Sequence, residues 1–179
     1  MAAATAPLTV DQFLQLPEDD SVRRELIGGE VITMAGAGQT HEIVKANFNR
    51  KLVAYLEQDL IGLVMPETMF RLGPHDSPQP DVSVVLSGRL APGHTGLIAF
   101  APDIAVEVVS SEPASILLAK VKLYLQHGTR AVWVAYPEQR AVFVYDASGV
   151  RELSGEQILE APEVLPGFRV PVSAFFDGL

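Results

Sequence analysis

Cysteine is absent from this chain of 179 residues. Disulfide bridges, thiolate metal sites and cysteine nucleophiles are therefore excluded, and the absence is typical of proteins that work in a reducing compartment. No apolar run approaches the roughly 18 residues that a membrane-spanning helix needs. The opening stretch MAAATAPLTV also lacks the charged start and long apolar core of a secretory signal. We expect a cytoplasmic protein with no membrane partner.

Basic side chains are also few, with 13 Lys and Arg against 22 Asp and Glu, so the formal net charge is -9. A protein that coats nucleic acid releases counterions through clustered Lys and Arg, and this charge argues against that class. A P-loop, a dinucleotide-binding glycine pattern and Cys/His zinc spacing are missing as well. The chain has 48% hydrophobic residues, which is enough for one substantial core and favours a single domain over residues 1–179.

The spacing of apolar residues predicts an α/β fold in which helices flank a mixed sheet. Thr9 followed by Gln12 forms a capping-box pattern that predicts a short first helix, which Pro17 ends. Gly28-Gly29 between two β-forming runs predicts a tight hairpin.

Longer elements follow the hairpin. Apolar residues recur at intervals of three and four from Thr40 to Leu60, which predicts a helix of about five turns. We expect a second helix over residues 115–128, and strands within residues 63–72, 80–86, 104–109, 131–137 and 141–149. The proline-containing tail, residues 165–176, is expected to be irregular and to dock three aromatic side chains onto the domain, Phe168, Phe175 and Phe176.

Two carboxylates stand inside apolar strand-like runs, Asp81 in PDVSVV and Glu107 in IAVEVV. A charge buried in a sheet costs several kcal/mol unless a cation, a metal or hydrogen bonds compensate it. Paired carboxylates can hold a divalent cation, which can activate a water against a phosphodiester. The alternative is a pair of salt-bridged residues on edge strands.

Seven segments carry a resemblance to a known family: RRELIGGEVITMAG, THEIV, PETMFRL, QPDVSVV, PDIAVEVVS, KVKLYLQHGTRAVWVAYPEQRAVFVY and LPGFRVPVSAFF. In order and spacing they resemble the bacterial family of putative restriction endonucleases (Uma-type), which belongs to the PD-(D/E)XK nuclease superfamily. The resemblance implies a restriction-endonuclease-like core over about residues 8–176. It also implies a site for Mg²⁺ or Mn²⁺ and the cleavage of phosphodiester bonds in DNA.

Carried over by position, Asp81 resembles the Asp of the PD element and Glu107 the acidic residue of the next strand, so both would bind the metal. The superfamily places a lysine two residues after that acid, where this chain has Val109. The family instead supplies its lysine from the following helix, which here offers Lys120 and Lys122. They lie on opposite flanks of the apolar stripe, so helix geometry leaves both open. The family spacing of a lysine followed four residues later by a tyrosine favours Lys120, whose ammonium would act on the water and offset phosphate charge.

Two further residues match positions that the family keeps polar near its site. Glu30 would complete the metal shell directly or through water, and His41 would contact a phosphate oxygen or a metal-bound water at a helix N-terminus, with Lys122 as a further substrate contact. The alternatives are a solvated hairpin residue and a helix-entry residue. The family also carries an Asp in the loop before the lysine, which this chain lacks, and Glu112 is a candidate substitute.

These residues support two hypotheses. One is a metal-dependent DNA endonuclease, expected to form a homodimer because duplex DNA has two-fold symmetry. The other is a catalytically decayed, dimeric binding module that keeps the nuclease fold. Convergence of Asp81, Glu107 and Lys120 on one point favours the first.

Overall fold

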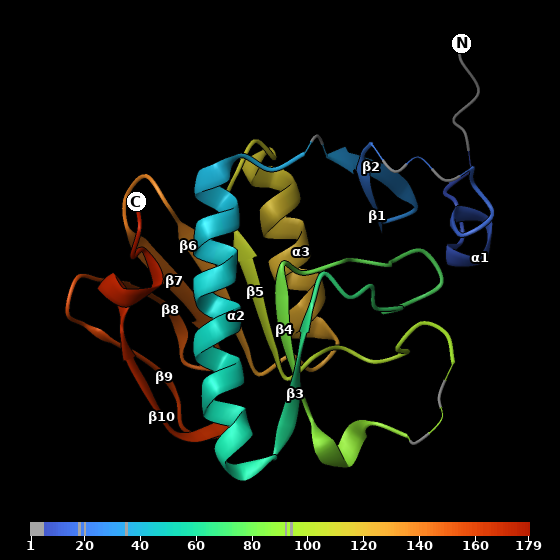
Figure 1. The fold of residues 1–179 in the computed structure, drawn as a ribbon. Helices are drawn as coiled ribbons and strands as arrows, with labels where there is room; N and C mark the ends of the chain where they lie inside the picture. The colour runs from blue at the N-terminus through green and yellow to red at the C-terminus, as the bar shows by residue number, and fades with distance from the viewer. Residues whose placement is uncertain (1–5, 18, 20, 35, 92, 94) are drawn as a thin grey trace.

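A six-stranded mixed sheet forms the centre of the computed structural model, which describes residues 6–17, 19, 21–34, 36–91, 93 and 95–179 (Figure 1). The strands lie in the order β3-β4-β5-β6-β7-β8, and every neighbouring pair is antiparallel except β5 with β6. A parallel pair needs a crossover connection, here helix α3, Ala114–Gln126. The strands are β3 Gly62–Pro66, β4 Val82–Leu86, β5 Ile104–Val108, β6 Ala131–Tyr136, β7 Ala141–Asp146 and β8 Gly149–Ser154.

The two faces of this sheet have different covers. Helix α2, Gln39–Asp59, lies over one face and α3 lies behind the other (Figure 1). The α2 face also packs against the pair β9, Ile158–Ala161, and β10, Leu165–Pro171, and against the short 3-10 helix η2, Val172–Phe175. The α/β fold class predicted from the sequence is confirmed.

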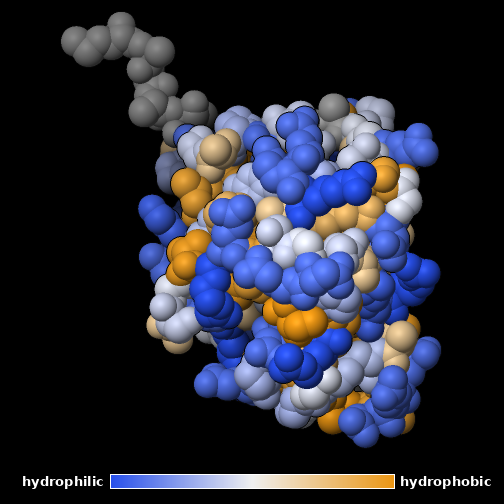
Figure 2. Space-filling model, turned by 90° about the vertical axis from the view of Figure 1, so that its left-hand side faces the viewer, coloured by the Kyte–Doolittle hydropathy of each residue, from blue (hydrophilic) through white to orange (hydrophobic). Residues whose placement is uncertain are grey.

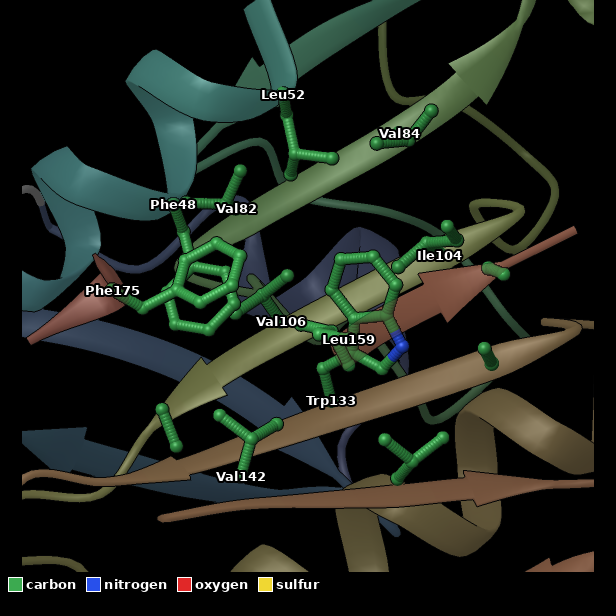
Figure 3. Packing of buried hydrophobic residues seen from close by; sticks show 14 of the residues in the cluster. Phe48, Leu52, Val82, Val84, Ile104, Val106, Trp133, Val142, Leu159 and Phe175 are labelled. Carbon is green, nitrogen blue, oxygen red and sulfur yellow. The ribbon is translucent and has the colours of Figure 1, made fainter. Parts of the chain in front are cut away.

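Aromatic rings join the α2 layer to the C-terminal segment. Phe48 and Phe175 stack with their ring centroids 4.1 Å apart, and Figure 3 shows both in the cluster that contains Trp133. Trp133 in turn stacks on Phe168 of β10 at 5.8 Å. These rings are almost fully buried, so the C-terminal segment completes the core on this face.

Alternation along β5 gives Glu107 its position. Ile104, Val106 and Val108 point into the core under α2, whereas Ala105 belongs to the core under α3. Side chains alternate between the two faces of a strand, so Glu107 also points toward α3. Every residue of β5 is buried. A strand that is covered on both faces has a continuous run of apolar residues in its sequence. A single carboxylate within such a run is therefore conspicuous.

The predicted capping box and hairpin are confirmed, but the first helix ends at Phe13, before Pro17. Thr9 and Gln12 form the capping box of a short helix, α1, Val10–Phe13, and both partners of the box are hydrogen-bonded. Strands β1, Arg23–Ile27, and β2, Glu30–Met34, form an antiparallel hairpin. Its turn residues Gly28 and Gly29 have φ angles of 60° and 79°, which residues with a Cβ rarely adopt.

The prediction of an irregular tail is wrong, although its three phenylalanines dock as expected. Residues 165–176 form β10 and η2, and β10 pairs with β9, which the sequence reading missed together with β8. Prolines stand second and last in β10, and the pairing register shifts between Leu165 and Val170. A two-stranded pair with such an irregularity tolerates missing N–H donors, so these prolines do not exclude a strand.

The sheet edge at β8 is mostly exposed and includes Arg151 and Glu152. Charged side chains on an edge strand discourage pairing with other chains. Figure 2 shows one side of the molecule, where hydrophilic residues separate small hydrophobic patches. Within the described part of the chain, no helix is both long and apolar enough to cross a bilayer.

The stacking of Phe168 on Trp133 generates a stability prediction. Phe168→Ala should lower the free energy of unfolding by about 3–5 kcal/mol, because it opens a cavity in the aromatic cluster. Leu118→Ala, at a position that is 45% exposed on α3, should change it by no more than about 0.5 kcal/mol. Urea denaturation followed by Trp133 fluorescence measures both. A loss below about 1 kcal/mol for Phe168→Ala would show that β10 lies outside the cooperative core.

Candidate active site

A cavity of about 170 Å³ that is lined by many charged residues lies where β1, α2, the start of β4, β5 and α3 meet. Asp81 stands directly before β4, and Glu107 is the next-to-last residue of β5. These strands are antiparallel, so the start of one meets the end of the other. The charged residues in the cavity lining are Arg23, His41, Glu42, Glu67, Asp81, Glu107, Glu112 and Lys120.

Asp81 is almost completely buried and is held by three donors. Its Oδ1 accepts from the Arg23 guanidinium at 2.7 Å. Its Oδ2 accepts from the backbone N–H of Val108 at 2.7 Å and from Nε2 of His41 at 3.2 Å. Burial raises the pKa of Asp81, but the His41 hydrogen bond, the Arg23 charge and the Val108 amide outweigh it and hold the pKa well below its usual range.

Glu107 meets two side chains of α3. Its Oε2 accepts from Nζ of Lys120 at 2.7 Å, and its Oε1 accepts from the Tyr124 hydroxyl at 2.7 Å. Lys120 and Tyr124 are one helical turn apart, so one face of α3 presents both donors to the strand beneath it. The three side chains are at most 1% exposed. Lys120 and Tyr124, the predicted Lys–Tyr pair, therefore form a two-donor clamp on the Glu107 carboxylate.

The hairpin adds two residues that the sequence reading missed, Arg23 and Glu25. Glu25 is fully buried, and its Oε1 lies 3.0 Å from the Arg23 guanidinium and 3.2 Å from Nζ of Lys120. A signal was present: Arg23 and Glu25 are two residues apart in a predicted strand, so both point to the same face. Glu25 precedes Leu26 and Ile27 in this strand, so its carboxylate, once buried, likewise requires a partner.

The structure shows which of the two candidate lysines, Lys120 or Lys122, lies in the site. Lys120 is 1% exposed and bridges Glu25 and Glu107, whereas Lys122 is exposed and does not line the cavity. Asp81, Glu107 and Lys120 all line the one cavity, so the structure brings these three together as the first hypothesis requires.

Glu30 lies apart from them. It is exposed at the start of β2, pairs with Ile27 beside the turn, and does not line the cavity. The acidic residue that the hairpin contributes is Glu25 instead. The expectation that Glu30 completes the metal shell thus has no support from its position, because its side chain stands at the solvated end of the hairpin.

His41 lies in the first turn of α2, as predicted, and is buried against Asp81. Its Nδ1 also contacts Oε1 of Glu42 at 3.3 Å, so both ring nitrogens face carboxylate oxygens. Burial lowers the pKa of His41, but the hydrogen bonds and charges of Asp81 and Glu42 outweigh it and raise the pKa above its ordinary value. This environment favours the imidazolium form.

The cluster holds more negative than positive charge. Four carboxylates, those of Glu25, Asp81, Glu107 and Glu112, face the cations of Arg23, Lys120 and protonated His41. Burial raises the pKa of Glu107 to about 8, since the neighbouring carboxylates of Asp81 and Glu25 add to it and Lys120 only partly opposes it. Lys120 keeps its proton because, although burial lowers its pKa, the charges of Glu107 and Glu25 raise it further. The surplus negative charge is offset either by a proton on Glu107 or by an added cation.

The chemistry of the donors fits Mg²⁺ or Mn²⁺, which prefer oxygen ligands. Glu112 points an unpartnered, buried Oε2 into this environment, and a carboxylate oxygen that already accepts one hydrogen bond keeps a second lone pair. Two features oppose easy binding. All four oxygens of Asp81 and Glu107 already contact protein donors, and among the described residues no three His, Asp or Glu side chains are grouped to hold one ion. A bound ion would therefore require a donor to move.

Among the comparisons with known proteins, a family model shows the family and a solved structure shows the fold. The sequence model of the family described as "Uma2: Putative restriction endonuclease" matches residues 10–173. Among solved structures, the chain is similar to the crystal structure of "a putative nuclease belonging to DUF820" from Anabaena variabilis ATCC 29413. The TM-score is 0.85 at 24% sequence identity, over 95% of this chain and 98% of that chain. A search of curated proteins found no match.

The raised pKa of Glu107 generates a prediction about pH. A carboxyl whose pKa is higher in the folded than in the unfolded protein stabilises the fold below its ordinary pKa of 4.5, and this contribution is lost as the pH rises toward about 8. Glu107→Gln cannot titrate, so between pH 5 and pH 9 its stability should improve by at least about 1 kcal/mol relative to the native protein. Urea denaturation in EDTA measures this difference.

Glu138→Gln, at an exposed turn between β6 and β7, is the matched control and should follow the native pH profile. Parallel profiles for Glu107→Gln and the native protein would contradict the placement of the proton on Glu107.

Proposed function

The chain belongs to the Uma2 family of putative restriction endonucleases, and from that premise we propose that it is a metal-dependent endonuclease that hydrolyses phosphodiester bonds in DNA. The observation that carries the proposal is the 2.7 Å contact between Lys120 and Glu107 beside Asp81. It unites two carboxylates and one ammonium from β4, β5 and α3 in one cavity. Val109 occupies the usual lysine position of the superfamily, and an ammonium delivered from α3 supplies the missing charge.

In this proposal Asp81 and Glu107 hold Mg²⁺ or Mn²⁺. When bound, the ion would lower the pKa of a water molecule and offset negative charge on the phosphate. Tyr124 and Lys120 fix the orientation of the Glu107 carboxylate, and the Val108 amide fixes that of Asp81. Ligands that are oriented before binding lose less entropy when the ion arrives.

Lys120 acts as a donor in this mechanism. Its raised pKa keeps it an ammonium, so it orients a water and stabilises charge that develops on the phosphate, and it does not accept a proton. His41 is favoured as an imidazolium and lines the same cavity, so it donates a hydrogen bond to a phosphate oxygen once a substrate competes for it.

A second function has one observation in its favour. The carboxylate oxygens of Asp81 and Glu107 are all engaged by protein donors, as expected in a binding module whose cations replaced the metal. The two functions predict different metal affinities for the protein, because only the nuclease requires a metal ion that is bound through Asp81. The proposal also includes the homodimer that duplex symmetry favours and the cytoplasmic location expected from the sequence.

The nuclease function is tested by plasmid cleavage. Asp81→Asn, Glu107→Gln and Lys120→Met should each lower the rate of supercoiled plasmid nicking in Mg²⁺ or Mn²⁺ by about 100-fold or more, because each removes a metal ligand or a charge that acts on the phosphate. Lys51→Met, on α2 beside Phe175, removes a lysine outside the cavity and should leave the rate within about twofold.

Thermal denaturation of each variant separates a lost activity from a lost fold. Cleavage that survives both Asp81→Asn and Glu107→Gln, in proteins with native-like melting, would overturn the assignment of these carboxylates.

A further inference from the structure

We propose that Arg23 exchanges partners during the reaction: it holds Asp81 in the metal-free protein and binds the scissile phosphate once a divalent cation takes Asp81. This inference rests on the proposed nuclease function and assigns a role to a residue outside the carboxylate–lysine set.

The Arg23 guanidinium is forked between two carboxylates. Its NH1 donates to Oδ1 of Asp81 at 2.7 Å, and its NH2 donates to Oε1 of Glu25 at 3.0 Å and to the carbonyl of Gln79. Glu67 at the cavity lining is more distant, with its Oε1 3.9 Å from NH1. Arg23 thus has one contact to a proposed metal ligand and two contacts to groups that bind no metal in this account.

The Asp81 contact is the one that a metal would displace. Oδ2 of Asp81 is fixed by the Val108 amide, which is part of the sheet, so Oδ1 is the oxygen that a small movement can release. A divalent cation and a guanidinium repel each other when both approach the same oxygen. The divalent cation carries the higher charge, so its attraction to the carboxylate oxygen is stronger. Arg23 then loses the Asp81 contact but stays in the cavity, because Glu25 and the Gln79 carbonyl still hold NH2.

Exposure distinguishes Arg23 from the other cations of the cluster. Its side chain is 22% exposed, compared with 8% for His41 and 1% for Lys120. Arg23 is therefore the cation in the cavity lining that a substrate arriving from solvent meets most directly.

The guanidinium also has unused donors. Its Nε is buried and has no hydrogen-bond partner, and release of Asp81 would free NH1 as well. A guanidinium carries several planar N–H donors, so NH1 can bind a phosphate oxygen while NH2 stays on Glu25 and Gln79, which a single lysine ammonium cannot reproduce in the same geometry. A phosphate beside Asp81 would accept from NH1, the donor that loses Asp81 to the ion.

A Mn²⁺ titration by calorimetry tests the exchange without cleavage. If Arg23 competes with the ion for Asp81, Arg23→Gln should bind Mn²⁺ about tenfold more tightly than the native protein, the effect of removing one charge-assisted hydrogen bond. Arg24→Gln is the matched control, since it removes the same charge from the opposite face of the same strand and should leave the affinity unchanged within about twofold. A purely structural role for Arg23 would weaken Mn²⁺ binding.

A second titration tests the phosphate contact. With Mn²⁺ saturating, Arg23→Gln should bind inorganic phosphate about tenfold more weakly than the native protein and Arg24→Gln, because a metal–phosphate contact is common to all three. Arg23→Lys replaces the Gln variant in this test if that variant does not fold. It keeps the positive charge but cannot donate to several partners in one plane, so it should bind Mn²⁺ more tightly and phosphate more weakly than the native protein.

The outcomes separate the two proposals. Unchanged or weaker Mn²⁺ binding in a folded Arg23 variant, while the native protein binds Mn²⁺ through Asp81, would overturn the exchange and leave the nuclease function standing. Native phosphate affinity in Arg23→Gln or Arg23→Lys would likewise overturn it. Absence of Mn²⁺ binding in the native protein and in every variant would overturn the metal-dependent function, and the exchange would fall with it.

Discussion

The buried ion pair between Lys120 and Glu107 is the interaction on which the rest of the site depends. Both side chains are 1% exposed, so neither charge can be hydrated. Removing a charge from water costs several kcal/mol, and a 2.7 Å contact with further hydrogen bonds from Tyr124 and to Glu25 offsets that cost. A pair of this kind adds little net free energy to folding. It nevertheless fixes the geometry of the two side chains strictly, because removal of either partner leaves an uncompensated buried charge.

The topology of the sheet makes that pair possible. β5 and β6 are parallel, so the chain must cross over the sheet between them, and α3 makes this crossing on the face toward which Glu107 points. β4 lies antiparallel beside β5, which brings Asp81 to the end of β5 and within reach of the Val108 amide. The β1–β2 hairpin then lines the cavity with Arg23, which Glu25 holds from behind. Segments far apart in the sequence thus meet at one end of two neighbouring strands.

Much of this arrangement could be predicted from the sequence. Asp81 and Glu107 were identifiable because a carboxylate in an apolar strand requires a partner, and the long elements because their apolar periods are clear. The choice between Lys120 and Lys122 depended on the family spacing, since both flank the apolar stripe and only packing shows which one is buried. The burial of Lys120 and the clamp with Tyr124 follow from the register of α3 on β5, which local spacing does not determine.

The misses also have physical reasons. β10 contains two prolines and pairs irregularly with β9, so its local signal favours a loop, whereas the burial of Phe168 against Trp133 holds it on the core. Glu30 was selected because it matches a position that the family keeps polar, and Glu25 was not considered. The deciding fact, which end of the hairpin meets the cavity, is a tertiary contact. The balance of charge in the cluster is also a tertiary property, since its members come from segments that are far apart in the sequence.

The central claim is that Asp81 and Glu107 form one metal site next to the Lys120 ammonium. Anomalous diffraction from crystals grown with Mn²⁺ tests it most directly, because it locates the ion without reference to activity. The account predicts an anomalous peak between the Asp81 and Glu107 carboxylates, with Lys120 still beside Glu107. A peak at other residues, or none in this cavity at saturating Mn²⁺, would contradict it.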